Sequence, residues 1–362
     1  PAAAPFARVG STSPLAIPRE LADRIARTEA LHHRLNEADL ALQRARGGHP
    51  NPGGYRLLPE PEPETWPETG PEGAAARVQP VDPPETATYW VYDETLDERV
   101  QHTFTRRGLT ASAVYYEMDG MPVAEQVTQT RIDALLDYYE QWGDAIIEDA
   151  FGGLAPSGMT TNFVDSRPAA DLDQNGGRVV VLQIPDDIML SGAAAYVSSC
   201  DRYPRLENVQ SGFFCTGSNE AEVTYFAAPT SDFYLGTLVH EVKHISSHGW
   251  ALYSSRGYNP SWIEEGTAEI AKEKSSRDAV GLADGAEAGY ADLYPGGSRS
   301  RESYGMATVY GRAARYLYHS PNAGLVDTPE DSNSTYYGAS WLFHRFLTDA
   351  WGSGDEDAFH SA

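Results

Sequence analysis

The chain has 362 residues, 41% of them hydrophobic, which is ample for a buried core in one large domain or two moderate ones. Its 52 acidic and 27 basic residues give a formal net charge of −25. This charge repels phosphate backbones and anionic membrane surfaces, so it argues against a nucleic-acid-binding protein. The sequence contains no apolar run of the length that a membrane span requires.

The first 85 residues precede the predicted core. Within a tail at 1–50, an amphipathic stripe over 18–46 predicts a helix. We expect this helix to pack on the body of the protein; pairing with a second copy or a propeptide remnant are the alternatives. Residues 51–85 are rich in Pro, Gly and Glu, which predicts a linker or wrapping arm.

Residues 86–125 are predicted to form a small antiparallel β unit, and residues 126–362 the main domain. The β unit rests on three short β-prone runs at 88–92, 99–106 and 111–117, which turn signals separate. In the main domain, 129–151 has helical spacing, and 178–184 is the strongest strand signal, so we expect it to be central. A second strand is predicted at 222–227, and helices follow at 261–275, 303–319 and 335–350.

One segment before the central strand begins like a calcium-binding loop. Asp171, Asp173 and Asn175 place side-chain oxygens at alternate positions, and Gly176 follows. The twelfth position is Leu182, where a complete loop needs a glutamate. We therefore favour a β-turn here, with Ca²⁺ binding as the alternative.

The only two cysteines, Cys200 and Cys215, are predicted to form a disulfide that closes a short polar loop; two free buried thiols are the alternative. Loop-closure estimates give such a bridge roughly 3 kcal/mol of stabilisation. A disulfide favours an exported, extracellular protein. The chain opens at Pro1 rather than at methionine, which is compatible with a leader that has been removed.

The strongest chemical signal is His240-Glu241-x-x-His244, inside a run with the apolar spacing of a buried helix. Residues four apart lie one turn above each other on the same helix face, so both imidazoles can reach one metal ion. Glu241 lies beside them and can move protons. Zn²⁺ is the cation that this pattern favours.

A second segment, from Trp262 to Glu269, supplies what the first one lacks. A zinc site with two imidazoles needs a third protein ligand and one open position. Glu265 follows His244 after a loop long enough for the chain to reverse, so it is the predicted third ligand, with Glu264 as its nearest competitor. Glu269 shares the helix face of Glu265 and is predicted to hydrogen-bond a ligating imidazole.

These two segments resemble the gluzincin metallopeptidases, most closely the secreted bacterial hyicolysin-like family. The segment around Ser218-Asn219-Glu220 and the run Tyr337-Gly-Ala-Ser340 add to the resemblance. It implies an α+β, thermolysin-like zincin fold with a β-rich N-terminal lobe, a helical C-terminal lobe and the active-site helix between them. A metzincin does not fit, because its third histidine would fall at Trp250.

The resemblance implies a zinc endopeptidase that acts on protein or peptide substrates, with Glu241 as general base. It also implies an oxyanion donor from the helical lobe, for which Tyr336 and Tyr337 are the candidates and His319 the reserve. In gluzincins a sheet edge pairs with extended peptide, a role that we expect of 222–227. His248 lies one turn beyond His244, and we expect it to have a surface role or to support the ligands without binding the ion.

Two other functions compete with the endopeptidase. A zinc aminopeptidase would need acidic residues that grip a free N-terminus, and its Gly-Ala-Met-Glu-Asn signature is absent. A non-catalytic binding or adhesion module would hold a structural zinc ion. The presence of Glu241 argues against that module, because a structural ion has no use for a base.

Overall fold

The computed structural model describes residues 82–93, 96, 98–154, 177–189, 193–202, 217–253, 259–319, 335–352 and 355–361. The predicted N-terminal helix, most of the predicted linker and the calcium-like run at 171–176 lie outside these residues. Cys200 lies in the 3-10 helix η7 (Ser199–Arg202), whereas Cys215 is not among the described residues, so the Cys200–Cys215 disulfide stays a prediction.

The described strands form one curled, mixed sheet of six strands in the order β1-β2-β3-β4-β6-β5. They are β1 (Thr86–Asp93), β2 (Glu98–Leu109), β3 (Ala113–Met118), β4 (Val179–Gln183), β5 (Ala195–Val197) and β6 (Val223–Phe226). The first three strands pair antiparallel, whereas β3, β4 and β6 run parallel to one another. β5 is antiparallel to β6.

The three predicted N-terminal strand runs are confirmed, but they do not form a sheet of their own. β3 pairs in parallel with β4, from Ala113 opposite Val179 to Glu117 opposite Gln183. The predicted central strand is also confirmed, because β4 is fully buried and has a neighbour on each side. Its side chains alternate between two cores: Val179 and Val181 contact the helices, and Val180 and Leu182 face the opposite side.

The prediction that 222–227 offers an exposed sheet edge is wrong. β6 occupies the middle of a three-strand group, with β4 on one side and β5 on the other. Tyr225, for example, lies opposite both Leu182 and Tyr196. A strand that pairs on both sides has no free edge for a peptide, so β6 cannot add one.

The described helices account for most of the described residues outside the sheet. They are η2 (Val123–Glu125), α2 (Gln129–Tyr138), η3 (Tyr139–Gly143), α3 (Asp144–Phe151), α4 (Phe233–Tyr253), α5 (Ser261–Val280), α6 (Tyr290–Leu293), η9 (Pro295–Gly297), α7 (Tyr304–His319), α8 (Thr335–Trp351) and α9 (Glu356–Ser361). The predicted helix at 129–151 is confirmed, with one addition: a π-helical turn, η3, joins α2 to α3.

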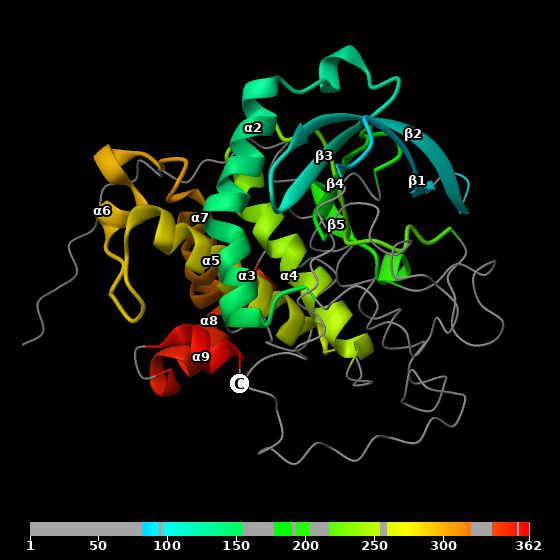
Figure 1. Ribbon diagram of the computed structural model, residues 1–362. Coiled ribbons are helices and arrows are strands. Elements are labelled where there is room, and N and C mark those ends of the chain that lie inside the picture. The colour runs from blue at the N-terminus through cyan, green and yellow to red at the C-terminus, as the bar shows by residue number, and fades with distance from the viewer. Residues whose placement is uncertain are drawn as a thin grey trace, which may run out of the picture.

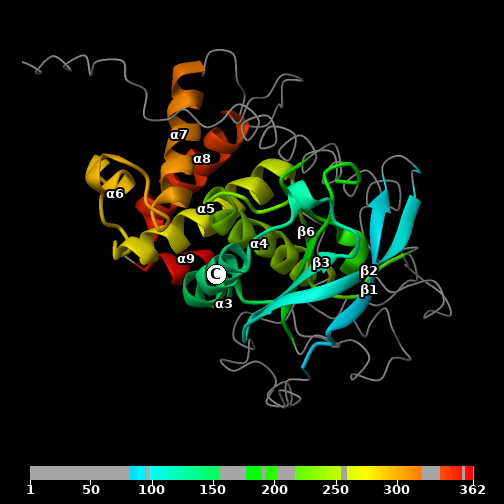
Figure 2. The same ribbon diagram turned by 90° about the horizontal axis from the view of Figure 1, so that it is seen from above.

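α4 lies between the sheet and the other C-terminal helices. In Figure 1 the cyan and green sheet lies on one side of α4, and the yellow to red helices lie on the other. Figure 2, viewed from above, shows the same order, with α5, α7 and α8 beyond α4. The molecule is therefore a mixed α+β structure. No helix in the described part of the chain combines the length and apolar character needed to cross a membrane.

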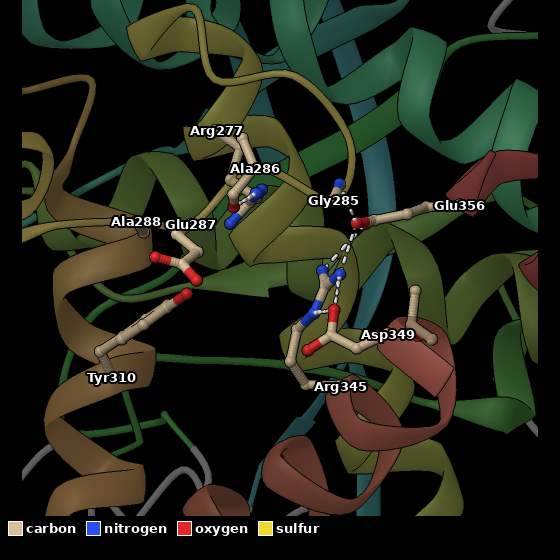
Figure 3. A pocket seen from close by; sticks show the side chains of 10 residues that line it. Arg277, Gly285, Ala286, Glu287, Ala288, Tyr310, Arg345, Asp349 and Glu356 are labelled. Atoms are coloured by element: carbon tan, nitrogen blue, oxygen red, sulfur yellow. Dashed lines mark hydrogen bonds and ion pairs between the residues drawn. The ribbon is translucent and has the colours of Figure 1, made fainter. Parts of the chain in front are cut away.

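Ion pairs tie the C-terminal half of α5 to α8 and α9, and Figure 3 shows the part of this network that Arg345, Asp349 and Glu356 form. Arg345 on α8 bonds the carboxylates of Asp349 and Glu356, and its Nη1 lies 3.7 Å from Glu273 Oε2 on α5. Burial alone would raise the pKa of Glu356, but hydrogen bonds from Arg345 and from the Gly285 amide lower it to about 2. Arg345, Asp349 and Glu356 are among the residues that line a pocket of about 530 Å³. Arg277 and Arg345 in its lining already form ion pairs with glutamates of the protein, so we interpret the network as structural.

Candidate metal centre

α4 presents two histidines to the interior. His240 and His244 are 5% and 2% exposed, and they lie one helical turn apart. The apolar side chains on the rest of the helix, among them Leu238, Val239 and Val242, pack into the core beside the sheet. This burial holds α4 in place, so both imidazoles reach the same point without a change of backbone.

The third side chain comes from α5. His240 Nε2 and His244 Nε2 lie 3.1 Å apart. Glu265 Oε2 lies 3.2 Å from the first nitrogen and 3.4 Å from the second. The three residues are all buried, and they are a group able to hold a metal ion. The structure thus brings together the three residues that the sequence predicts as metal ligands.

The spacing of these atoms fits a zinc ion. Two atoms bound tetrahedrally to zinc at about 2.0–2.1 Å lie about 3.3–3.4 Å from each other. The separations of 3.1, 3.2 and 3.4 Å match this spacing closely. Two imidazoles and one carboxylate, with a position left for water, are also a common ligand set of catalytic zinc sites.

Close contact between α5 and α8 fixes the position of Glu265. A Cβ atom added at Gly266 would lie 2.3 Å from His344 Nδ1 and 2.9 Å from the Ser340 carbonyl oxygen. Only glycine permits this approach, because any side chain would push the two helices apart. The Glu265-Gly266 pair in the sequence is therefore explained by packing as well as by chemistry.

Glu269 lies behind His240, one turn along α5 from Glu265. Its Oε1 atom is 3.1 Å from His240 Nδ1. The same oxygen accepts a 2.5 Å hydrogen bond from Arg312 on α7 and lies 3.5 Å from Lys272 Nζ. Burial alone would raise the pKa of Glu269, but Arg312 and Lys272 lower it well below the ordinary value. A carboxylate at Nδ1 orients the imidazole so that Nε2 faces the ligand group.

Glu264, the competitor for the third ligand, has a different place. Its Oε1 atom lies 3.3 Å from His244 Nδ1, on the side of the ring away from the ligand group. Lys243 Nζ is 3.1 Å from the same oxygen. Burial alone would raise the pKa of Glu264, but Lys243 and His244 lower it well below the usual range. Glu265, and not Glu264, is therefore the carboxylate that faces both Nε2 atoms.

Tyr337 lies against the site, and Tyr336 lies beside Tyr337. The ring of Tyr337 stacks on His240 with the centroids 6.1 Å apart, and Arg312 lies over the same ring at 5.1 Å. Tyr336 packs edge-on against Tyr337 at 5.9 Å. Both tyrosines are 3% exposed. The stacking of its ring on His240 makes Tyr337 the stronger of the two candidates.

His248 is buried, which excludes the surface role and leaves the other expected one, support of the ligands without binding the ion. Its ring stacks on His244 with the centroids 6.4 Å apart, and the residue is 6% exposed. It does not belong to the group that converges on Glu265. His248 lies one helical turn beyond His244, so its ring contacts the His244 ring and does not reach the atoms that could bind the ion.

Gly338 allows α8 to bring Tyr337 to His240, and its replacement by alanine is expected to destabilise the protein by about 1–3 kcal/mol. The new Cβ atom would lie 2.3 Å from the backbone carbon and oxygen of Arg312, which have little room to move. Urea unfolding of the chelator-treated protein measures the loss. Gly289→Ala is the matched control, because its Cβ meets only Asp292 Oδ2 at 3.4 Å. Equal losses in the two variants would contradict the packing argument.

No protein-family model matches this chain, and no curated protein matches it. The case for a function therefore rests on the geometry of the site and on the motifs in the sequence.

Proposed function

We propose that the protein is a zinc-dependent endopeptidase of the gluzincin type, similar to the hyicolysin-like enzymes and with a thermolysin-like arrangement. The observation that carries the proposal is the buried triangle of His240 Nε2, His244 Nε2 and Glu265 Oε2, with Glu241 next to His240 on the same helix. The position of α4, with the sheet on one side and the helices on the other, supports the fold part of the proposal (Figure 2).

In this proposal each residue of the site has one role. His240, His244 and Glu265 would hold the ion, and Glu269 and Glu264 would orient the two imidazoles. When bound, zinc supplies Lewis acidity that polarises a peptide carbonyl and lowers the pKa of water. Glu241 accepts a proton from the attacking water and passes it to the leaving amine nitrogen. The site residues are buried, and electrostatic interactions between them are stronger there because the protein interior screens charges less than water does.

The developing oxyanion needs a further donor, and we assign that role to Tyr337. Replacing Tyr337 by phenylalanine keeps the ring that stacks on His240 and removes only the hydroxyl. We expect kcat to fall by about 10²–10³-fold with KM nearly constant, as for the loss of one oxyanion donor. Steady-state kinetics on a peptide substrate measures this split.

Tyr336→Phe is the matched control, because Tyr336 is equally buried and contacts Tyr337. Its kcat is expected to stay within a few-fold of the parent enzyme. An equal loss in both variants would mean that the hydroxyls act through the packing of α8, and full activity of Tyr337→Phe would remove the assignment.

Digestion of casein by zinc-loaded protein, with and without a chelator, tests the proposal as a whole. We expect internal cleavage that the chelator abolishes and added zinc restores, with one zinc ion per chain by elemental analysis. Release of single N-terminal residues instead would identify an aminopeptidase. Bound zinc without any hydrolysis would identify a binding module with a structural ion.

A further inference from the structure

Lys243 and Glu264 form a buried ion pair directly behind His244. Each is the chain neighbour of a member of the ligand group: Lys243 precedes His244 on α4, and Glu264 precedes Glu265 on α5. Their side chains are 4% and 3% exposed, and Lys243 Nζ lies 3.1 Å from Glu264 Oε1. The same oxygen lies 3.3 Å from His244 Nδ1. One carboxylate oxygen therefore serves both the ammonium group and the imidazole.

A stabilising role alone does not account for this pair. Desolvation of two charges offsets most of their attraction, so a buried ion pair is weak evidence for stability. Apolar residues of the same volume would often hold two helices together equally well. Asn259 Nδ2 donates to the second oxygen of Glu264 at 3.0 Å, which fixes the plane of the carboxylate. A carboxylate held in one orientation can accept a hydrogen bond from one fixed direction.

The imidazole of His244 is the group that needs such an oriented acceptor. Its Nε2 atom faces His240 Nε2 and Glu265 Oε2. A lone pair on Nε2 requires the ring proton to be on Nδ1, where an acceptor must receive it. Glu264 is that acceptor, and Lys243 balances its charge in an interior where an isolated carboxylate is strongly unfavourable.

His240 has the same kind of support from different residues. Glu269 lies at its Nδ1 atom, and Arg312 and Lys272 compensate the charge. The two imidazoles thus have separate carboxylates on α5 and separate cations. Because the supports are independent, the support of His244 can be removed while that of His240 stays intact.

We propose that Lys243 and Glu264 are positioning residues that orient His244 and set which of its nitrogens is available to a metal ion. The inference rests on the proposed metal site, which it deepens. It requires that loss of the pair weakens metal binding even when the fold is fully restored.

The experiment compares zinc affinity with the stability of the metal-free protein in three variants. Lys243→Met and Glu264→Leu each leave one buried charge without its partner, so both should lower Tm. The double variant removes both charges, and we expect its Tm to return close to that of the parent. Its zinc affinity, from competition with a chromophoric chelator, is expected to remain about 10–100-fold weaker, as for other residues that orient a metal ligand.

Lys274→Met is the matched control. Like Lys243 on α4, Lys274 on α5 is a buried lysine in ion pairs, with Asp284 Oδ1 and Asp357 Oδ1 each 3.0 Å away. It belongs to the ion-pair network that joins α5 to α9. This variant should lower Tm and leave zinc affinity unchanged. A loss of zinc affinity here would show that any weakening of α5 disturbs the site, which would overturn the specific role of Lys243 and Glu264.

The outcomes separate this inference from the proposed function. If the parent protein binds no zinc, the proposed function fails. If the parent binds zinc and the double variant binds it equally well, the pair is structural and the inference fails alone. Should the double variant not fold, Glu264→Gln carries the test, because it keeps the shape and loses the charge. The absorption spectrum of its Co²⁺ form should then differ from that of the parent, and an unchanged spectrum with unchanged affinity would reject the inference.

Discussion

Glu241→Gln is expected to abolish turnover while the protein still binds zinc. Glutamine has the size of glutamate but cannot accept a proton, and Glu241 is completely buried, so a variant of the same shape is needed to keep the packing. Loss of a general base costs about 10²–10⁴-fold in rate. We therefore expect kcat on a peptide substrate to fall by that factor, with KM changed much less.

Zinc content and Tm are the controls for this variant. Both should match the parent, because the group that can hold a metal ion does not include Glu241. Glu287→Gln, at an exposed position far along the chain from α4, should retain full activity. Substantial turnover in Glu241→Gln would remove Glu241 as the base and leave the hydrolytic mechanism without a proton acceptor on α4.

The ligand group could be predicted from sequence because its geometry is local. Two histidines four residues apart fall on one face of any helix, and Glu265 and Glu269 do the same on the next one. Only the packing of α4 against α5 depends on tertiary structure, and the loop between the two helices is long enough to allow it. The central strand β4 could be predicted equally well, because a continuous run of apolar residues such as Val179 to Leu182 is typical of a strand buried on both faces.

The order of the strands could not be predicted in this way. β5 has only three residues, Ala195–Val197, too few for a periodic signal, and it covers the side of β6 that the sequence predicted to be open. The pairing of β3 with β4 is likewise a contact between distant parts of the chain. Residue patterns report which face of a strand is buried but not which strand is its neighbour.

The supporting charges of the site were missed for a related reason. Arg312 and Lys272 approach Glu269 from α7 and α5, and Lys243 approaches Glu264 from α4. The sequence does contain a signal: the chain has only three lysines, of which Lys243 directly precedes the proposed ligand His244 and Lys272 follows Glu269 by three residues. Scarce lysines beside a metal motif favour a role in the interior, because solvated surface positions in this chain use arginine instead.

Glu265→Ala is expected to lose the metal. Two imidazoles remain in this variant, but the carboxylate oxygen that lies 3.2 and 3.4 Å from their Nε2 atoms is gone. We expect zinc affinity to fall by well over the roughly 10–100-fold that loss of an orienting residue costs. Dialysed protein should then contain almost no zinc, and peptidase activity should disappear with it. Elemental analysis and the chelator competition assay measure the two effects.

Glu269→Gln is the matched control, because it removes an orienting carboxylate and leaves the proposed ligand in place. Glu269 is as buried as Glu265 and lies on the same helix, but it contacts the Nδ1 side of His240. Its replacement should weaken zinc binding only within the range for an orienting residue, so the two variants should differ clearly in zinc content after dialysis. Full zinc occupancy in Glu265→Ala would mean that another carboxylate completes the site, and Glu264, 3.3 Å from His244 Nδ1, is the nearest one to test. That outcome would also require α5 to rotate, because Glu264 and Glu265 lie about 100° apart around the helix axis.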